Sequence, residues 1–343
     1  MNTLAISLFD GNDKELLLFG LFTVVIFVFL LVDLGLFNKE AHKITTRSAL
    51  NQSIFWVAVS LAFGLLIYLS GPYELHDRGQ ITVLDGLDAS LLYLSAYLTE
   101  KALSVDNIFV ILLILKYFRV NEIYYHKILF WGILGAIVFR AFFIFVGAYL
   151  IHQFHWILYI FGVFLIYSGI RIYFEDGDEK IEPEKNPILR FCKRYLPLST
   201  DDRGGQFAFW ENGKIFFTPL FLVIVLIETT DLIFAVDSIP AAFAITTNEF
   251  LIYTSNIFAV LGLRAMFFLL AGIIDKFYLL QKGLSIILFF IGAKMLLDIV
   301  DVHINVYLSF TVIIATLLLS ILFSIVIPRR ASIPNNNNDT TEQ

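Results

Sequence analysis

The chain has 343 residues, of which 58% are hydrophobic and 16% are charged, and its formal net charge is −6. Soluble domains usually carry about 25% charged residues, so the composition excludes an ordinary soluble protein, and the negative charge argues against nucleic acid as a partner. The single cysteine, Cys192, excludes an intrachain disulfide and any multi-cysteine metal site.

Nine apolar stretches are long enough to cross a bilayer, which takes about 20 helical residues. In chain order, the predicted spans are Leu16–Phe37, Ser48–Ser70, Leu87–Leu115, Ile128–Ile151, Trp156–Ile172, Ile215–Ile239, Ile252–Ile274, Gly283–Val300 and Ile304–Ile327. These stretches are continuous and do not alternate, which favours helices over a barrel. We therefore expect an all-α polytopic membrane protein with about nine transmembrane helices.

The spans divide the chain into five predicted parts. They are an N-terminal two-helix segment (1–86), a first three-helix unit (87–172), a loop (173–214), a second three-helix unit (215–300), and a last helix with a polar tail predicted to be disordered (301–343). The loop 173–214 is the longest connection between spans. The low-complexity composition of the tail gives it no means of forming a packed core.

Basic residues follow every odd-numbered span. Lys39, Lys43 and Arg47 follow the first span, for example, and Arg329 and Arg330 follow the ninth. Loops on the cytoplasmic side of a membrane carry an excess of Lys and Arg. The pattern predicts an extracytoplasmic N-terminus, a cytoplasmic C-terminus and a cytoplasmic location for the loop 173–214.

Six acidic residues lie inside these otherwise apolar stretches. They are Asp33, Glu100, Asp106, Glu228, Asp231 and Asp237. A charged side chain at the centre of a bilayer costs roughly 2.5–3.5 kcal/mol on insertion scales, so such residues usually mark an ion or proton path. The alternative is a set of structural pairs between these acids and nearby Lys or Arg residues.

Two of the predicted units contain matching segments. Val105–Ile108, which includes Asp106 and Asn107, aligns with Val236–Ile239, which includes Asp237 and Ser238. The same register places Glu100 opposite Asp231, and the segment at Arg140 aligns with that at Arg264. Three helices per unit is an odd number, so the second unit must run opposite to the first. This predicts an inverted 3+3 repeat, a plan common among transporters; chance similarity between apolar helices is the alternative.

Helical geometry places only some of these polar residues on a common face. At about 100° per residue, Glu100 and Asn107 share one face, and Asp231 and Ser238 share another. Asp106 and Asp237 point roughly 120° away from these faces unless the helix is broken nearby. Pro240 would permit such a break in the second unit and free backbone carbonyls as further ligands.

The available ligand atoms are all oxygens, which suit Mg²⁺, Ca²⁺ or Mn²⁺ and disfavour Zn²⁺ or Cu⁺. The expected metal ligands are Glu100, Asp106, Asn107, Asp231 and Asp237. The expected supporting residues are Glu228, Ser238, Arg140, Arg264 and Asp33, with both arginines holding acids in place. In the two units, five acids minus three bases, the third being Lys101, leave two negative charges. One divalent cation or two protons would balance them, so proton–cation exchange stays open.

The segments Glu100–Asn107 and Asp231–Pro240 resemble the two signatures of the TerC family, and most of all its Alx branch. The similarity extends to Thr254–Ala259, Leu261–Met266 and Trp156–Gly162, and it covers roughly residues 15–327. The resemblance implies a multi-pass protein of the bacterial inner membrane linked to manganese export, with further ties to tellurite resistance and to alkaline or redox responses. The choice of manganese over calcium or magnesium comes from the family alone.

We therefore expect a divalent-cation exporter, most of all for manganese(II), without enzymatic activity and without a tightly bound cofactor. The sequence has no GxxxxGK[ST] phosphate-binding loop, which argues against ATP drive within this chain. An intramembrane aspartyl protease using Asp106 and Asp237 is disfavoured, because no Gly-x-Gly-Asp or Tyr-Asp pair occurs in the spans. A membrane scaffold of stress response or tellurite resistance without transport activity is the main alternative.

Overall fold

The computed structural model describes residues 13–37, 45–77, 80–154, 156–174, 186–201, 203–211, 213–271, 278–300 and 302–326. The polar tail expected to be disordered lies outside the described residues. Asp33 belongs to a described helix, but its side chain lies outside the described part of the chain. The prediction of a supporting role for Asp33 therefore stays open.

Helices form almost all of the described structure. In chain order they are α2 (Asp13–Phe37), α3 (Thr46–Ser70), α4 (Gly86–Tyr117), α5 (Tyr125–Gln153), α6 (Ile157–Phe174), α7 (Pro187–Tyr195), α8 (Pro219–Ile245), α9 (Glu249–Leu261), α10 (Leu263–Leu270), α11 (Tyr278–Leu297) and α12 (Val306–Val326). Two short 3₁₀ helices lie between them: η1 (Glu122–Tyr124) precedes α5, and η4 (Asp298–Val300) follows α11. The all-α class predicted from the sequence is confirmed.

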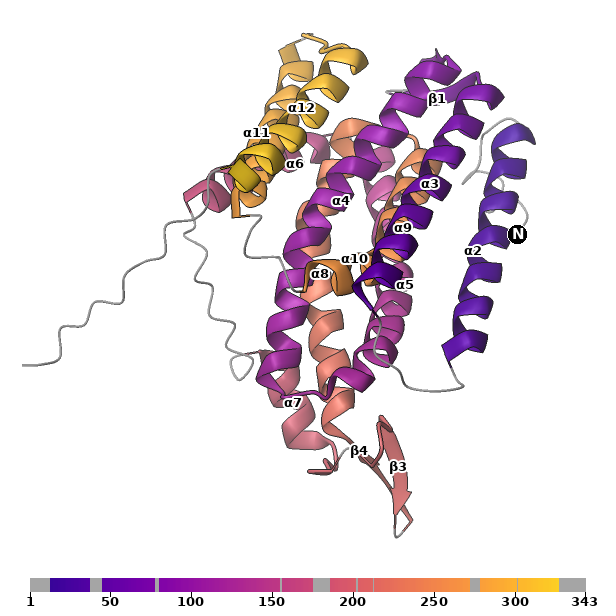
Figure 1. Ribbon diagram of the computed structural model, residues 1–343. Coiled ribbons are helices and arrows are strands. Elements are labelled where there is room, and N and C mark those ends of the chain that lie inside the picture. Colours follow the sequence, from indigo (N-terminus) through magenta and orange to yellow (C-terminus); the bar gives the residue numbers. More distant parts are fainter. Residues whose placement is uncertain are drawn as a thin grey trace, which may run out of the picture.

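Two small antiparallel hairpins interrupt this helical plan, and the sequence patterns gave no sign of them. Strand β1 (Tyr73–Asp77) pairs with β2 (Gln80–Leu84), and β3 (Ala208–Glu211) pairs with β4 (Lys214–Phe217). The hairpins lie at opposite ends of the helical bundle (Figure 1). Each lies in a connection between long helices.

Seven helical segments among the described residues are long and apolar enough to cross a membrane, and α9 and α10 count as one of them. The apolar stretch found within α2, Leu17–Leu31, is shorter. Helix α4 is not among the seven, although its 32 residues make it about 48 Å long at 1.5 Å per residue. It carries the charged residues Glu100, Lys101 and Asp106 close together near its middle. The protein is a multi-pass membrane protein, and the count of nine spans stays a prediction.

Helices α4 and α8 run in opposite directions through the middle of the bundle (Figure 1). Helix α4 packs against α3, α8, α9 and α12, and α5 packs against α8 and α9. Helices α6 and α11 form a tight pair that contacts α8. A Cβ atom at Gly169 would lie 2.7 Å from the Ser285 carbonyl oxygen and 2.9 Å from the Phe289 nitrogen. Only glycine therefore permits this approach of α6 to α11.

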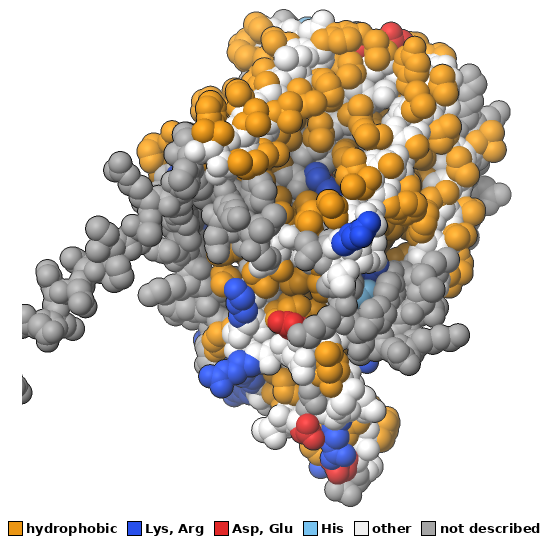
Figure 2. Space-filling view, in the orientation of Figure 1, with side chains coloured by type: hydrophobic (Ala, Val, Ile, Leu, Met, Phe, Trp, Pro, Cys, Tyr) orange, Lys and Arg blue, Asp and Glu red, His pale blue; other side chains and the backbone are white. Residues whose placement is uncertain are grey.

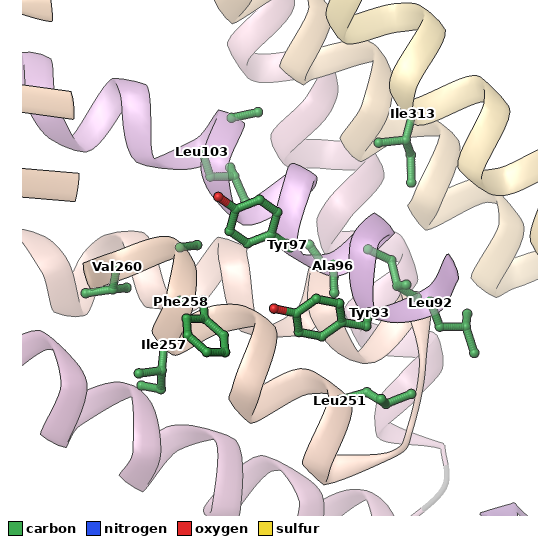
Figure 3. Packing of buried hydrophobic residues seen from close by; sticks show 14 of the residues in the cluster. Leu92, Tyr93, Ala96, Tyr97, Leu103, Leu251, Ile257, Phe258, Val260 and Ile313 are labelled. Atoms are coloured by element: carbon green, nitrogen blue, oxygen red, sulfur yellow. The ribbon is translucent and has the colours of Figure 1, made fainter. Parts of the chain in front are cut away.

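The largest buried cluster joins α4 to α9 and contains tyrosines as well as aliphatic residues. Figure 3 shows Tyr93 and Tyr97 side by side on α4, on the side where Phe258 of α9 lies. The two tyrosine rings are nearly parallel, with centroids 6.5 Å apart. The hydroxyl of Tyr93 is 2.9 Å from Ser60 Oγ of α3. This hydrogen bond lets a polar group be buried at low cost.

The helix break that Pro240 would permit is absent, because α8 continues from Pro219 to Ile245 with Pro240 inside it. Pro240 lies near the end of the helix, where the loss of one backbone hydrogen bond is tolerated by the surrounding packing. A break occurs instead at Gly262, between α9 and α10. The ammonium of Lys101 lies beside Gly262 and donates to the Ala259 carbonyl oxygen at 3.3 Å. Lys101 therefore satisfies a carbonyl at the end of α9.

Candidate functional site

A buried ion network joins four helices at the centre of the bundle. Arg140 of α5 is fully buried and donates through Nη1 to Glu100 Oε1 of α4 and, at 2.8 Å, to Asn256 Oδ1 of α9. Its Nη2 donates to Asp231 Oδ1 of α8 at 3.4 Å. Asn256 Nδ2 in turn donates to Glu100 Oε2 at 3.0 Å. Glu100 and Asp231, which the repeat alignment paired, therefore share one arginine.

The network contains two carboxylates and one guanidinium, so it carries one uncompensated negative charge when both acids are ionised. Both oxygens of Glu100 accept hydrogen bonds, and the residue is 3% exposed. The side chain of Asp231 is 12% exposed, and its Oδ2 is buried without a hydrogen-bond partner among the described residues. Asp231 is therefore the network member with an oxygen left for another ligand.

A small cavity of about 30 Å³ lies beside the network. Its polar lining comes from Asn107 of α4 and from Thr230 and Asp231 of α8; the rest is apolar and includes Ile111 and Ile227. Asn107 Oδ1 is buried and, like Asp231 Oδ2, has no hydrogen-bond partner among the described residues. The volume is sufficient for one or two waters or for one cation. Two residues of the lining therefore each carry a carbonyl or carboxylate oxygen that no described donor occupies.

The structure does not bring all five expected metal ligands together. Glu100, Asn107 and Asp231 belong to the network or the cavity, whereas neither Asp106 nor Asp237 lines the cavity. Asp237 lies on another face of α8 and accepts a hydrogen bond from Ser168 Oγ of α6 at 2.8 Å. Asp106 is half-buried on α4. Among the described residues, no group of three or more acidic, His or Cys side chains could hold a metal ion.

Three of the expected supporting residues besides Arg140 have described side chains. Glu228 is half-buried, and its carboxyl occupies the space beside Gly135 of α5, where a Cβ atom would collide with it. Its Oε2 is buried without a partner among the described residues. Ser238 is buried and its Oγ also lacks a partner there, whereas Arg264 is buried at the start of α10.

Two residues of these contacts were not predicted as site residues. Asn256 bonds to both Arg140 and Glu100, and Ser168 bonds to Asp237. A buried amide in an apolar helix was the available signal for Asn256, because an unpaired amide is costly in hydrocarbon. No such signal existed for Ser168, since a serine in a membrane helix commonly bonds to its own backbone.

Comparisons with known proteins identify the family. Residues 86–332 match the integral membrane protein TerC family, so the chain belongs to the TerC family, as its motifs predicted. A "Putative membrane-bound redox modulator Alx" of Escherichia coli K12 is 43% identical over 310 residues, covering 90% of this chain and 94% of that protein. No solved structure matches the chain.

Two further relatives carry no functional description. An uncharacterized membrane protein of Myxococcus xanthus is 40% identical over 312 residues, which is 90% of this chain and 92% of that protein. An uncharacterized membrane protein of Rickettsia bellii is 40% identical over 306 residues, which is 89% of this chain and 96% of that protein. The relatives therefore support a bacterial membrane protein of this family and leave its substrate open.

Proposed function

We propose that this protein is a secondary carrier that exports a divalent cation, first of all manganese(II), across the bacterial inner membrane. The observation that supports this function is the cavity next to the Arg140 network, since two of its lining residues, Asn107 and Asp231, each carry a buried oxygen without a described hydrogen-bond partner. Ionisable side chains inside membrane helices are costly and usually mark a substrate or ion path. Oxygen ligands suit a hard cation, and the family resemblance makes manganese the first to test.

In this proposal Arg140 sets both the geometry and the charge of the site. By bonding to Asp231 Oδ1 it leaves Oδ2 of the same carboxylate for the cavity. A divalent cation would bring two positive charges to a network with one negative charge. One further carboxylate would restore neutrality, and Glu228, one helical turn before Asp231, is the nearest along α8. Proton exchange at such a carboxyl would couple transport to the proton gradient.

Helix packing supports the inverted repeat that the proposal requires. Each helix of the first unit packs against its partner in the second: α4 against α8, α5 against α9, and α6 against α11. The cavity residues Asn107 and Asp231 come from α4 and α8, one helix of each unit. A substrate site between inverted units is the usual arrangement in secondary transporters. We place the N-terminus outside and the C-terminus in the cytoplasm, following the distribution of basic residues.

Manganese uptake into inverted membrane vesicles tests the proposal. We expect uptake by vesicles containing the wild type, and at least a tenfold lower initial rate for Asp231→Asn and Asn107→Leu. The first substitution removes the carboxylate charge of a lining residue, and the second removes an amide oxygen. The matched control is Glu211→Gln, which neutralises an exposed acid at the hairpin. Equal uptake by all variants at matched expression would contradict this site. Absence of uptake by the wild type would contradict manganese transport.

The alternative is a membrane scaffold or redox-response protein without transport, which the name of the Escherichia coli relative would suit. A scaffold should tolerate neutralisation of Asp231 when the fold is preserved, whereas a carrier should not. Cells that lack the protein can be supplied with the wild type or with Asp231→Asn and tested for growth under manganese, tellurite and oxidant stress. Rescue by Asp231→Asn as complete as rescue by the wild type would favour the scaffold.

A further inference from the structure

Helix α7, in the long loop between α6 and α8, is strongly specified by its sequence. Asn186 Oδ1 accepts hydrogen bonds from the backbone nitrogens of Ile188 at 2.9 Å and Leu189 at 3.1 Å. Pro187 occupies the first helical turn. An asparagine cap followed by proline is a favoured helix start. The local sequence of the loop therefore favours a helix at this position.

The helix has one face anchored to the protein and a second apolar face that is exposed. Leu189 and Cys192 are buried in a cluster with residues of α4, α5 and α8. Ile188, Phe191 and Tyr195 are 40%, 60% and 62% exposed, and they lie within about 60° of one another around the helix. The rings of Phe191 and Tyr195 have centroids 4.7 Å apart. They form a continuous exposed apolar face.

Basic residues occupy the remaining side of α7. They are Arg190, Lys193 and Arg194. The guanidinium of Arg194 lies 5.6 Å from the centre of the Tyr195 ring, at the boundary between the two faces. A helix with aromatic residues on one face and Lys or Arg on the other is typical of a helix that lies in the interface of a membrane.

The position of α7 matches the level of a membrane surface. Its buried face packs in the same cluster as Leu115, near the end of α4, and Ile128, near the start of α5. Both residues lie where a predicted span meets a basic loop. Figure 1 places α7 at the lower end of the bundle, and Figure 2 shows Lys and Arg side chains at that end, below the broad hydrophobic surface.

We propose that α7 lies in the cytoplasmic interface of the bilayer and binds the headgroups of anionic phospholipids. Ile188, Phe191 and Tyr195 insert among the upper acyl chains, while Arg190, Lys193 and Arg194 contact lipid phosphates. This occupant fits because the exposed apolar face lies at the level where predicted spans meet basic loops and the basic face complements an anionic leaflet. Each basic side chain near such a surface strengthens binding by about fivefold.

Packing also connects helix α7 to the candidate site. The cluster that buries Leu189 and Cys192 contains Ile111 and Ile227, which line the cavity. Helix α7 therefore packs in the same cluster as the start of α8 and one wall of the cavity. The lipid contact itself does not depend on which ion the protein carries.

A fluorescent dye at position 188 tests the lipid contact in the full-length protein. Cys192→Ala removes the native thiol, and Ile188→Cys then carries the dye, while Lys214→Cys on the β3–β4 hairpin carries it in the control protein. Both are placed in nanodiscs of phosphatidylcholine with spin-labelled phosphatidylglycerol or spin-labelled phosphatidylcholine. We expect headgroup spin labels to quench the dye at 188, with stronger quenching by phosphatidylglycerol, and iodide in water to quench mainly the dye at 214.

Neutralising Arg190, Lys193 and Arg194 together to glutamine should remove most of the preference for phosphatidylglycerol while the quenching by lipid remains. A dye at 188 that iodide quenches as strongly as the dye at 214 would overturn the proposal. Protection from both iodide and lipid labels, with crosslinking between two copies at position 188, would assign the face to a second copy and also overturn it. Equal quenching by both lipids in the unchanged helix would overturn the headgroup preference.

Discussion

Replacing Arg140 by methionine should expose how strongly the buried network depends on its guanidinium. The side chain is fully buried and contacts both Glu100 and Asp231. Methionine keeps much of the volume but leaves two buried carboxylates without this cation. Breaking a buried ion pair by removing one partner costs about 3–5 kcal/mol, because the remaining charge is uncompensated. We expect a loss of stability in that range.

The two acids should not contribute equally. Glu100 also bonds to Asn256 and is more deeply buried than Asp231, whose contact with Arg140 is 3.4 Å long. A double-mutant cycle should therefore give a coupling of about 3 kcal/mol between Arg140 and Glu100, and about 1 kcal/mol between Arg140 and Asp231. Glu100→Gln should recover much of the stability lost in Arg140→Met, whereas Asp231→Asn should recover less.

Reversible unfolding in mixed detergent micelles, followed by circular dichroism, measures these free energies. Arg203→Met is the matched control, since Arg203 contacts Glu211 through two hydrogen bonds of 2.9 and 3.0 Å but is exposed. An exposed pair contributes about 0–1 kcal/mol. A loss for Arg140→Met no larger than that for Arg203→Met would refute the reasoning, as would stronger coupling to Asp231 than to Glu100.

Two other contacts give separate predictions. Gly135→Ala should displace the Glu228 carboxyl, because the new methyl group would collide with it. That carboxyl ends a flexible side chain, so we expect transport to fall while thermal stability changes little; Gly20→Ala, which meets nothing within 4 Å, should leave both unchanged. Ser168→Ala should cost about 1–3 kcal/mol in the same unfolding assay by leaving the Asp237 carboxyl without its hydrogen bond. Equal transport by Gly135→Ala and Gly20→Ala, or equal stability of Ser168→Ala and wild type, would contradict the corresponding contact.

Hydrophobicity and residue type carried most of the information about the helices. The predicted span Ser48–Ser70 corresponds to α3, Thr46–Ser70, and Ile128–Ile151 lies within α5, Tyr125–Gln153. Local patterns succeed here because every backbone group in hydrocarbon must be bonded within its own helix. They permitted a break at Pro240 that α8 does not have, and they gave no sign of the break at Gly262, which Lys101 from another helix borders.

The sequence by itself determined the membrane class and the family, and it predicted that Glu100 and Asp231 occupy corresponding positions. Only the tertiary structure decided which side chains meet. Arg140 contacts partners 40, 91 and 116 positions away, and Asp237 turns to Ser168 and not to the cavity. Such contacts depend on how each helix is rotated and how closely it packs. A single helix's periodicity fixes which residues share a face, but the neighbour of that face is fixed only when all the helices assemble.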